Sequence, residues 1–342
     1  MEKNTGKLLT PTAGTPLDYL RWRGDLSFVR DGFNEVDNLI LCIISYLNFR
    51  RIDAVHTKTP ALAPTLAEVA PLLTEEDDQL GLSELSYLPL LRLAAQTERF
   101  KELRLFGYTH EYDAKCAKQF DALSFLVPDG TLFVAFMGTD TSLAGWKEDF
   151  NMSFLSAVPA QERAVSYAGE MAELCPSLPL RIGGHSKGGN LAVYAGARAA
   201  SSVQERILRV YSFDGPGVDE ETLGCEGYER ISARIESYIP QSSVVGMLLH
   251  YHPRYTVVRS TSLGILQHDA MTWQVENGDF VRQDDLDMSG KITDEAIHTW
   301  LQGMDMDQRR ELVDTLYHVV DASQAELVTD LVDDWRDSAV KA

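Results

Sequence analysis

A serine stands between glycines where an apolar run of the chain meets a helix-like run. Gly184-His185-Ser186-Lys187-Gly188 fits the pattern G-x-S-x-G, within the stretch RIGGHSKGGNLAVYAG at 181–196. A strand-like run enters the pattern and a run of small residues leaves it, the strand–turn–helix arrangement that presents a nucleophilic serine. An ordinary glycine-rich loop is the alternative. We predict that Ser186 is a nucleophile on a strained turn.

A serine hydroxyl attacks a carbonyl only when a base takes its proton. On a turn of this kind the partners follow in the order serine, acid, histidine. Asp214 comes directly after ILRVYSF at 207–213, and His268 lies beyond the strand-like run YTVVRS. We predict that Asp214 is the acid and His268 the base. Asp219 and Asp269 are weaker candidates for the acid, and Asp214 could instead cap the turn that follows it.

Seven other histidines compete with His268: His56, His110, His185, His250, His252, His298 and His318. His185 lies inside the turn, too close in sequence to swing onto Ser186. The histidines before the turn break the expected order. His250 and His252 could share one face of a strand and bind a metal ion, but no third ligand accompanies them. We therefore expect neither a metal nor a cofactor.

An oxyanion needs two donors in an acyl-transfer site. The N–H of Lys187, at the start of the helix-like run, is the first candidate. Thr139 is the second, because Gly138-Thr139 follows the apolar run TLFVAF and could turn a backbone N–H toward Ser186. The alternative for Thr139 is a simple polar turn after a strand.

The elements around these residues alternate in type. Two β-branched and aromatic runs flank Pro128-Asp129-Gly130 and predict a hairpin. Helical spacing is expected at 34–50, with Asn34 as the cap, and at 163–174. Further strands are predicted at LRIGG, ILRVYSF and YTVVRS. This alternation predicts an α/β fold with a mostly parallel sheet covered by helices on both faces.

The 342 residues are expected to form a single domain with a core at about 105–283. An N-terminal helical segment at 17–105 and acidic C-terminal helices at 284–342 would be added to it. Prolines at 60, 64, 71 and 89 break the N-terminal segment. We predict that apolar helices within 50–105 form a lid over the site.

The composition of the chain limits the classes of partner that the protein can bind. The formal charge is −20, from 31 basic and 51 acidic residues. Such a field repels phosphate backbones and anionic lipid surfaces, so we expect no nucleic-acid partner. The most apolar stretch, at 39–49, is too short to span a bilayer, so we expect no stable membrane insertion. We see no secretory signal, and the four cysteines form no C-x-x-C pair, which favours a cytoplasmic protein. The oligomeric state stays open.

Two separated motifs resemble those of the class 3 lipases. FMGTDTSLAGWKEDF resembles their F-R-G-T segment with its later tryptophan and aspartate, and GGHSKGGNLA resembles their G-H-S-x-G-G-x-L-A turn. More narrowly, the chain resembles the bacterial Mbeg1-like family, through GDLSFVRDGFNEVDNLIL, FDGPG, PQSSVVGMLL and QHDAMTW. The resemblance implies an α/β-hydrolase fold with added helices and a lipase or esterase activity.

The chain departs from the class 3 pattern at three places. Met137 stands where those lipases usually have arginine, and Lys187 replaces a residue that is often leucine. Ser242 and Ser243 occupy the place of the usual acid, so Asp214 can serve only if the acid has moved one strand earlier.

Two functions are compatible with these features. The first is a serine hydrolase that cleaves carboxylic esters, with a small-molecule or lipid ester as its substrate, through an acyl-enzyme on Ser186. The second is a non-catalytic binding or scaffold protein that retains the fold.

Overall fold

The structure is a computed structural model that describes residues 13–78, 86–113, 118–139, 158–243, 245–247 and 254–287. The expected C-terminal helices at 284–342 fall outside these residues beyond position 287, and so does the GWKEDF motif.

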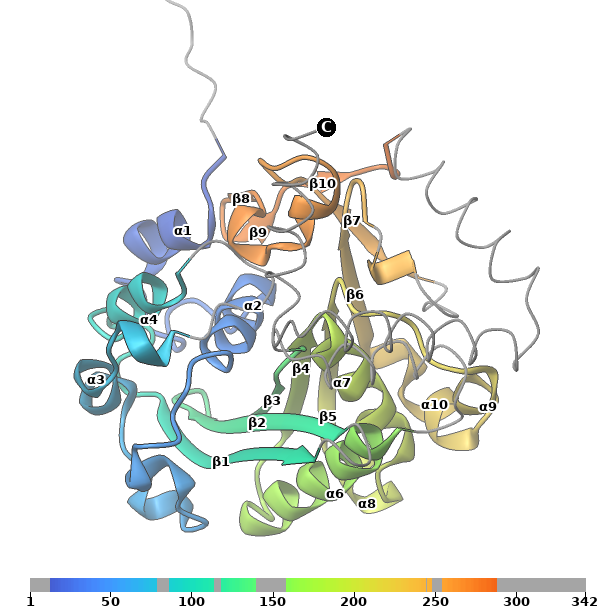
Figure 1. The fold of residues 1–342 in the computed structure, drawn as a ribbon, viewed down its shortest axis with the longest axis horizontal. Coiled ribbons are helices and arrows are strands. Elements are labelled where there is room, and N and C mark those ends of the chain that lie inside the picture. Colours follow the sequence, from blue (N-terminus) through green and yellow to red (C-terminus); the bar gives the residue numbers. More distant parts are fainter. Residues whose placement is uncertain are drawn as a thin grey trace, which may run out of the picture.

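An eight-stranded sheet forms the centre of the molecule, in the order β1-β2-β3-β4-β5-β6-β7-β10 (Figure 1). Its strands are β1 (Arg104–Asp113), β2 (Lys118–Val127), β3 (Thr131–Phe136), β4 (Leu180–His185), β5 (Ile207–Phe213), β6 (Ile235–Pro240), β7 (Thr256–Val258) and β10 (Arg282–Gln283). The strands from β3 to β7 run parallel, while β1, β2 and β10 pair antiparallel with their neighbours. A short hairpin of β8 (Val275–Glu276) and β9 (Asp279–Phe280) lies apart from this sheet.

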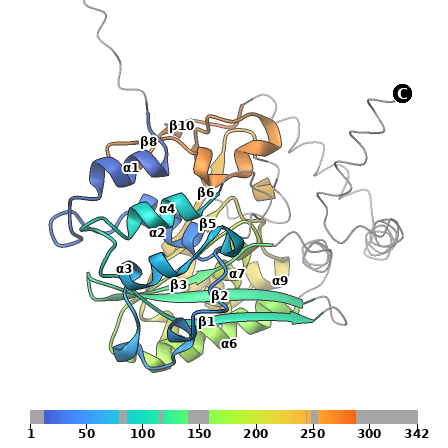
Figure 2. The same ribbon diagram turned by 60° about the vertical axis from the view of Figure 1, so that its left-hand side comes forward.

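Helices cover both faces of the sheet, as Figure 2 shows. One layer contains α1 (Pro16–Arg23), α2 (Glu35–Ile44), α3 (Leu66–Val69) and α4 (Leu88–Ala94). The other contains α6 (Pro159–Leu174), α7 (Lys187–Arg198), α8 (Ser201–Gln204), α9 (Glu220–Leu223) and α10 (Glu226–Ile231). The predicted α/β fold, a mostly parallel sheet covered by helices on both faces, is confirmed.

The two layers bury separate apolar clusters against the sheet, because side chains of a strand alternate between its faces. The α2 cluster contains Leu39, Ile43, Phe133 and Phe213, whereas the α7 cluster contains Val134, from the same strand as Phe133. Helix α2 begins where predicted, since the Asn34 side chain accepts hydrogen bonds from the N–H groups of Val36 and Asp37.

The prediction of the strands was incomplete. The hairpin of β2 and β3, with Gly130 at φ +84°, and strands β4, β5 and β7 lie where the sequence placed them. Strands β1 and β6 were missed. Gly107 has φ +68° and the register of β1 shifts between Phe106 and Thr109, so this strand lacks a continuous period-two pattern. Strand β6 is short, and two of its first three residues are half-buried.

The lid predicted within 50–105 stays a prediction, and the described part of this segment packs closely on the rest of the fold. Val55, Leu66 and Leu91 of this segment are fully buried in the same apolar cluster as α2 and the sheet. Prolines do break the segment into short helices, and many of their apolar side chains join the core, while Leu62 and Leu72 are exposed.

The longest described helix is α6, with 16 residues. Within the described ranges no helix has both the length and the apolarity that a bilayer-spanning segment requires.

Candidate active site

Ser186 lies in a strained turn between β4 and α7. Its backbone has φ 58° and ψ −135°, outside the regions that residues with a side chain favour, at a cost of about 1–3 kcal/mol. The turn is fixed on both sides, since the N–H of Ser186 donates to the carbonyl of Phe213 at 2.9 Å and its carbonyl accepts from the N–H of Gly189 at 2.8 Å. The strand–turn–helix predicted from G-x-S-x-G is therefore present.

Two glycines make this turn possible by close approach. A Cβ atom on Gly184 would lie 2.2 Å from the Gly188 backbone, and one on Gly188 would lie 2.1 Å from the carbonyl oxygen of Phe136. The first turn of α7 is thus pressed against the ends of β3 and β4. Lys187 is the first residue of this 12-residue helix, so its N–H has no acceptor four residues earlier in the helix. The positive end of the helix dipole lies beside Ser186.

The segment after β3 also lies against the serine. A Cβ atom on Gly138 would be 3.1 Å from Cβ of Ser186 and 2.9 Å from the His185 carbonyl oxygen. Thr139 is buried and follows directly. The predicted oxyanion segment is therefore a neighbour of Ser186. That the N–H groups of Thr139 and Lys187 converge on one point stays a prediction.

Asp214 and His268 meet at the same edge of the sheet. Oδ2 of Asp214 lies 2.6 Å from Nδ1 of His268, and the two residues are 1% and 9% exposed. Strands β4 and β5 are parallel neighbours whose last register pair is His185 and Phe213, so Ser186 and Asp214 follow paired residues. This is the placement that the serine–acid–histidine order led us to expect.

The second carboxylate oxygen of Asp214 is also held. Oδ1 accepts a hydrogen bond from Oγ of Ser243 at 2.5 Å and one from the N–H of Gly246 at 3.1 Å. Ser243 follows β6, the place where the class 3 lipases are expected to carry their acid. The Ser243 hydroxyl thus holds Asp214, which follows the adjacent strand β5. The described partners of Asp214 do not include the N–H groups of its own turn, contrary to the capping alternative.

The other candidate acids have structural partners. Asp219 caps α9 and accepts from the N–H of Thr222 at 2.7 Å. Asp269 accepts from the N–H of Met271 at 2.9 Å.

Two of the competing histidines have other partners. Nδ1 of His110 lies 2.6 Å from Oδ1 of Asp121, and Nε2 of His56 lies 3.1 Å from the carbonyl oxygen of Arg50. His250, His252, His298 and His318 lie outside the described residues, and with them the suggested metal pair.

The proton positions on the His268 ring follow from its partners. A carboxylate only accepts, so Nδ1 carries the proton that bonds Asp214, and in the neutral ring the lone pair is then on Nε2. Nε2 has no hydrogen-bond partner among the described residues. Oγ of half-buried Ser186 likewise forms no hydrogen bond within the described ranges. The serine and the histidine are therefore not hydrogen-bonded to each other in this structure. Such contacts in unliganded sites often tighten only when substrate binds.

The Lys187 side chain points away from the serine. It is 1% exposed, and its ammonium group donates to the carbonyl oxygen of Gln119 at 2.8 Å and to Oε1 of the same residue at 3.2 Å. Only its backbone N–H can therefore serve an oxyanion. Met137, in place of the usual arginine, is buried in the α2 cluster.

Three residues that touch this site were not assigned a role from sequence. The first two are Tyr46 and His185. The Tyr46 hydroxyl lies 3.0 Å from Nδ1 of His185, and Nε2 of His185 lies 2.7 Å from the carbonyl oxygen of His268. The third, Ser243, was noted only as standing where an acid was missing. The tyrosine is 139 residues away from His185, so no local pattern could reveal the contact.

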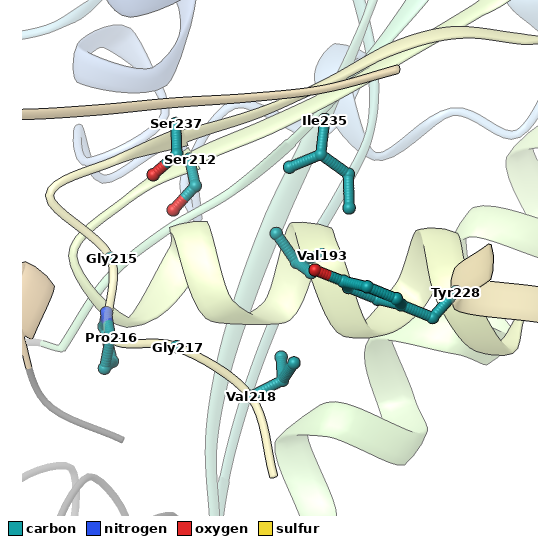
Figure 3. Close-up of a pocket in the computed structure, with 9 residues that line it drawn as sticks. All are labelled: Val193, Ser212, Gly215, Pro216, Gly217, Val218, Tyr228, Ile235 and Ser237. Atoms are coloured by element: carbon teal, nitrogen blue, oxygen red, sulfur yellow. The ribbon is translucent and has the colours of Figure 1, made fainter. Parts of the chain in front are cut away.

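A small hollow lies between the segment at 215–218 and helix α7 (Figure 3). Its volume is about 20 Å³, room for about one water molecule, so it cannot hold an acyl chain. It is lined by Val193, Ser212, Gly215, Pro216, Gly217, Val218, Tyr228, Ile235 and Ser237.

Comparison with known proteins gives a family and a set of folds. A family model described as Mbeg1-like matches residues 94–318. No sequence among the curated proteins matches the chain.

Several solved structures are similar in fold. The native lipase–propeptide complex of Rhizomucor miehei is 18% identical, with 57% of this chain and 66% of that chain covered and a TM-score of 0.36. M37 lipase is 13% identical, with coverage of 63% and 70% and a TM-score of 0.41. Lip2 lipase of Yarrowia lipolytica is 9% identical, with coverage of 67% and 84% and a TM-score of 0.38. The match spans just under two thirds of the Rhizomucor miehei chain.

Proposed function

We propose, from the premise that the chain belongs to the Mbeg1-like family, that it is a serine hydrolase that cleaves carboxylic esters. The observation that carries the proposal is the buried Asp214–His268 pair at the sheet edge where Ser186 occupies a strained turn. A strained backbone of this kind persists only where the surrounding structure enforces it, and it is frequent at active sites.

The geometry supports an acyl-transfer reaction in two steps. Oγ of Ser186 attacks the acyl carbon while Nε2 of His268 takes its proton, and Asp214 stabilises the imidazolium through Nδ1–H. The N–H groups of Lys187 and Thr139 bind the oxygen of the tetrahedral intermediate. His268 then returns the proton to the leaving alcohol. A water molecule, activated by His268, releases the acid and restores the Ser186 hydroxyl.

Exposed apolar side chains beside the histidine support an apolar acyl group. Leu263 and Leu266 lie in the segment that leads into His268 and are 82% and 59% exposed. Large exposed leucines next to a polar site suit a lipid-like ester better than a charged substrate.

The decisive experiment is labelling with a fluorophosphonate, which reacts with an activated serine. The wild-type protein should be labelled at Ser186, and Ser186→Ala should not be labelled. Ser201→Ala, an exposed serine at the start of α8, is the matched control and should be labelled like the wild type. Equal labelling of wild type and Ser186→Ala would overturn the proposal.

One observation favours a second function, a non-catalytic binding protein that retains the fold. Within the described residues Ser186 and His268 form no hydrogen bond. If the wild type stays unlabelled and turns over no ester, this second function replaces the first.

A further inference from the structure

His185, the residue directly before Ser186, reaches the turn that carries His268. It is the last residue of β4 and is 5% exposed. Its Nε2 atom lies 2.7 Å from the carbonyl oxygen of His268. The two imidazole rings lie beside each other, with centroids 4.6 Å apart and planes inclined by 34°. One residue therefore connects the nucleophile's strand to the backbone of the base.

The partners of His185 define its proton positions. A carbonyl oxygen only accepts, so Nε2 carries the proton and donates to His268. Burial, together with the neighbouring His268, lowers the pKa of His185 to about 3, so the ring is neutral and Nδ1 accepts. The hydroxyl of Tyr46 lies 3.0 Å from Nδ1 and 3.1 Å from the His185 carbonyl oxygen. The single proton of this hydroxyl can be donated to Nδ1 or to the carbonyl oxygen, so Tyr46 holds the ring and the backbone of His185 together.

The backbone around His268 is held at two successive carbonyl groups. The carbonyl oxygen of Gln267 accepts from Nε1–H of Trp273 at 2.9 Å, and that of His268 accepts from His185. The Gln267 side chain also accepts from the N–H of Ser242 at 2.8 Å. Of these contacts, only the one from His185 ties the histidine to the element that carries Ser186.

We propose that His185, held by Tyr46, is a positioning residue that sets the distance between the base His268 and the nucleophile Ser186. The inference rests on the proposed hydrolase function. Catalytic rates are sensitive to such distances, since a misplacement of about 1 Å can lower a rate by about 100-fold. Asp214 orients the imidazole ring of His268, whereas His185 places the backbone from which that ring extends.

The neutral state of His185 matters for the same reaction. His268 becomes positively charged when it takes the serine proton, and a second charged ring with its centroid 4.6 Å away would oppose this step. A neutral imidazole supplies a donor for the carbonyl without adding charge. A lysine or arginine at position 185 would supply a donor but bring the opposing charge.

Two substitutions at position 185 separate the hydrogen bond from the shape of the ring. His185→Gln keeps an N–H donor near the place of Nε2, and His185→Phe keeps a planar ring without a donor. For ester turnover we expect His185→Phe to lower kcat by about 10- to 100-fold with KM little changed. His185→Gln should recover most of this loss. Equal loss in both variants, or no loss in either, would overturn the proposal.

A readout independent of activity is the proton NMR signal of Nδ1–H of His268, which is bonded to Asp214. The Asp214→Asn variant identifies this signal by its change. His185→Phe should broaden or shift it, because the turn is no longer held, and His185→Gln should leave it near the wild-type position. An unchanged signal in His185→Phe would contradict positioning by His185. Because no turnover is needed, this result stands even if the hydrolase function fails.

Tyr46→Phe provides a smaller change if His185→Phe does not fold. It removes one hydroxyl and leaves the ring of Tyr46 in the apolar cluster. We expect kcat to fall by about three- to tenfold, since a hydrogen bond contributes about 0.5–1.5 kcal/mol. Wild-type kcat together with a wild-type His268 signal would overturn the role of Tyr46 and His185 as a unit.

Discussion

Asp37 in α2 and Asp214 at the end of β5 are both buried carboxylates, but their partners differ. Asp37 is 0% exposed and pairs with Arg99, which is also 0% exposed, through two hydrogen bonds of 2.7 and 2.5 Å. Asp214 is 1% exposed and pairs with the imidazole of His268. The guanidinium group is always charged, whereas an imidazole can gain and lose a proton near neutral pH.

The surroundings of the two pairs reinforce this difference. Arg99 also donates to the carbonyl oxygens of Leu26, Asp31 and Gly32, so its donors tie the segment before α2 to the helix. His268, by contrast, has one ring nitrogen without a partner among the described residues. A pair in which every donor is already bonded can stabilise the fold but cannot accept a further proton. A ring nitrogen without a partner can accept one. We infer that the Asp37–Arg99 pair stabilises the fold and that the Asp214–His268 pair takes part in proton transfer.

The largest expected effect is on turnover, from Asp214→Asn. The amide has the same size as the carboxylate, but its N–H group can donate to Nδ1 and so favour the other tautomer of His268. The amide is also neutral, so the negative charge that stabilises the imidazolium is lost. We expect ester turnover to fall by about 10⁴-fold while the fold is retained. Steady-state kinetics measure the ester turnover, and circular dichroism shows whether the fold is retained.

Asp219→Asn is the matched control, because Asp219 is a cap for α9, and its turnover should stay near the wild type. A loss smaller than tenfold in Asp214→Asn would place Asp214 with Asp37 among the structural carboxylates.

The second effect is on stability, from Arg99→Met. Removing one partner of a fully buried ion pair leaves the other charge uncompensated and costs about 3–5 kcal/mol. We expect a loss of this size in the free energy of unfolding by urea, with unchanged turnover per folded molecule. In a double-mutant cycle with Asp37→Asn the two losses should not add. A turnover that falls with Arg99→Met under folding conditions would show that this pair also serves the site.

The smallest effect concerns the second oxygen of Asp214. Ser243→Ala removes one donor from a buried carboxylate but leaves the N–H of Gly246. We expect kcat/KM to fall by roughly 10- to 100-fold, because one hydrogen bond to a charged group contributes about 1.5–3 kcal/mol. Ser166→Ala is the control, because the hydroxyl of that exposed serine donates to the Glu162 carbonyl oxygen within α6 at 3.1 Å. If both variants behave alike, the bond from Ser243 is not specific to the site.

Local patterns predicted the elements that carry the candidate residues. Glycine spacing placed Ser186, and the strand end at Phe213 placed Asp214 beside it, because neighbouring parallel strands end at one edge. The roles of Tyr46 and Ser243 depend on contacts between distant parts of the chain, which no local period encodes. The lid prediction meets the same limit. Apolar side chains such as Leu66 and Leu91 have the same spacing whether they face a substrate or a core.

The position of α2 limits how the gene for this protein can be shortened. Nine of the ten residues of this helix are buried, and Tyr46 follows two residues after its end. A shortened protein that began at β1 would still contain Ser186, Asp214 and His268. It would lack helix α2, which covers one face of the sheet. Its apolar surface would then favour aggregation. Truncation for expression or crystallisation should therefore start before Asn34, even though the chemistry is encoded more than 100 residues later.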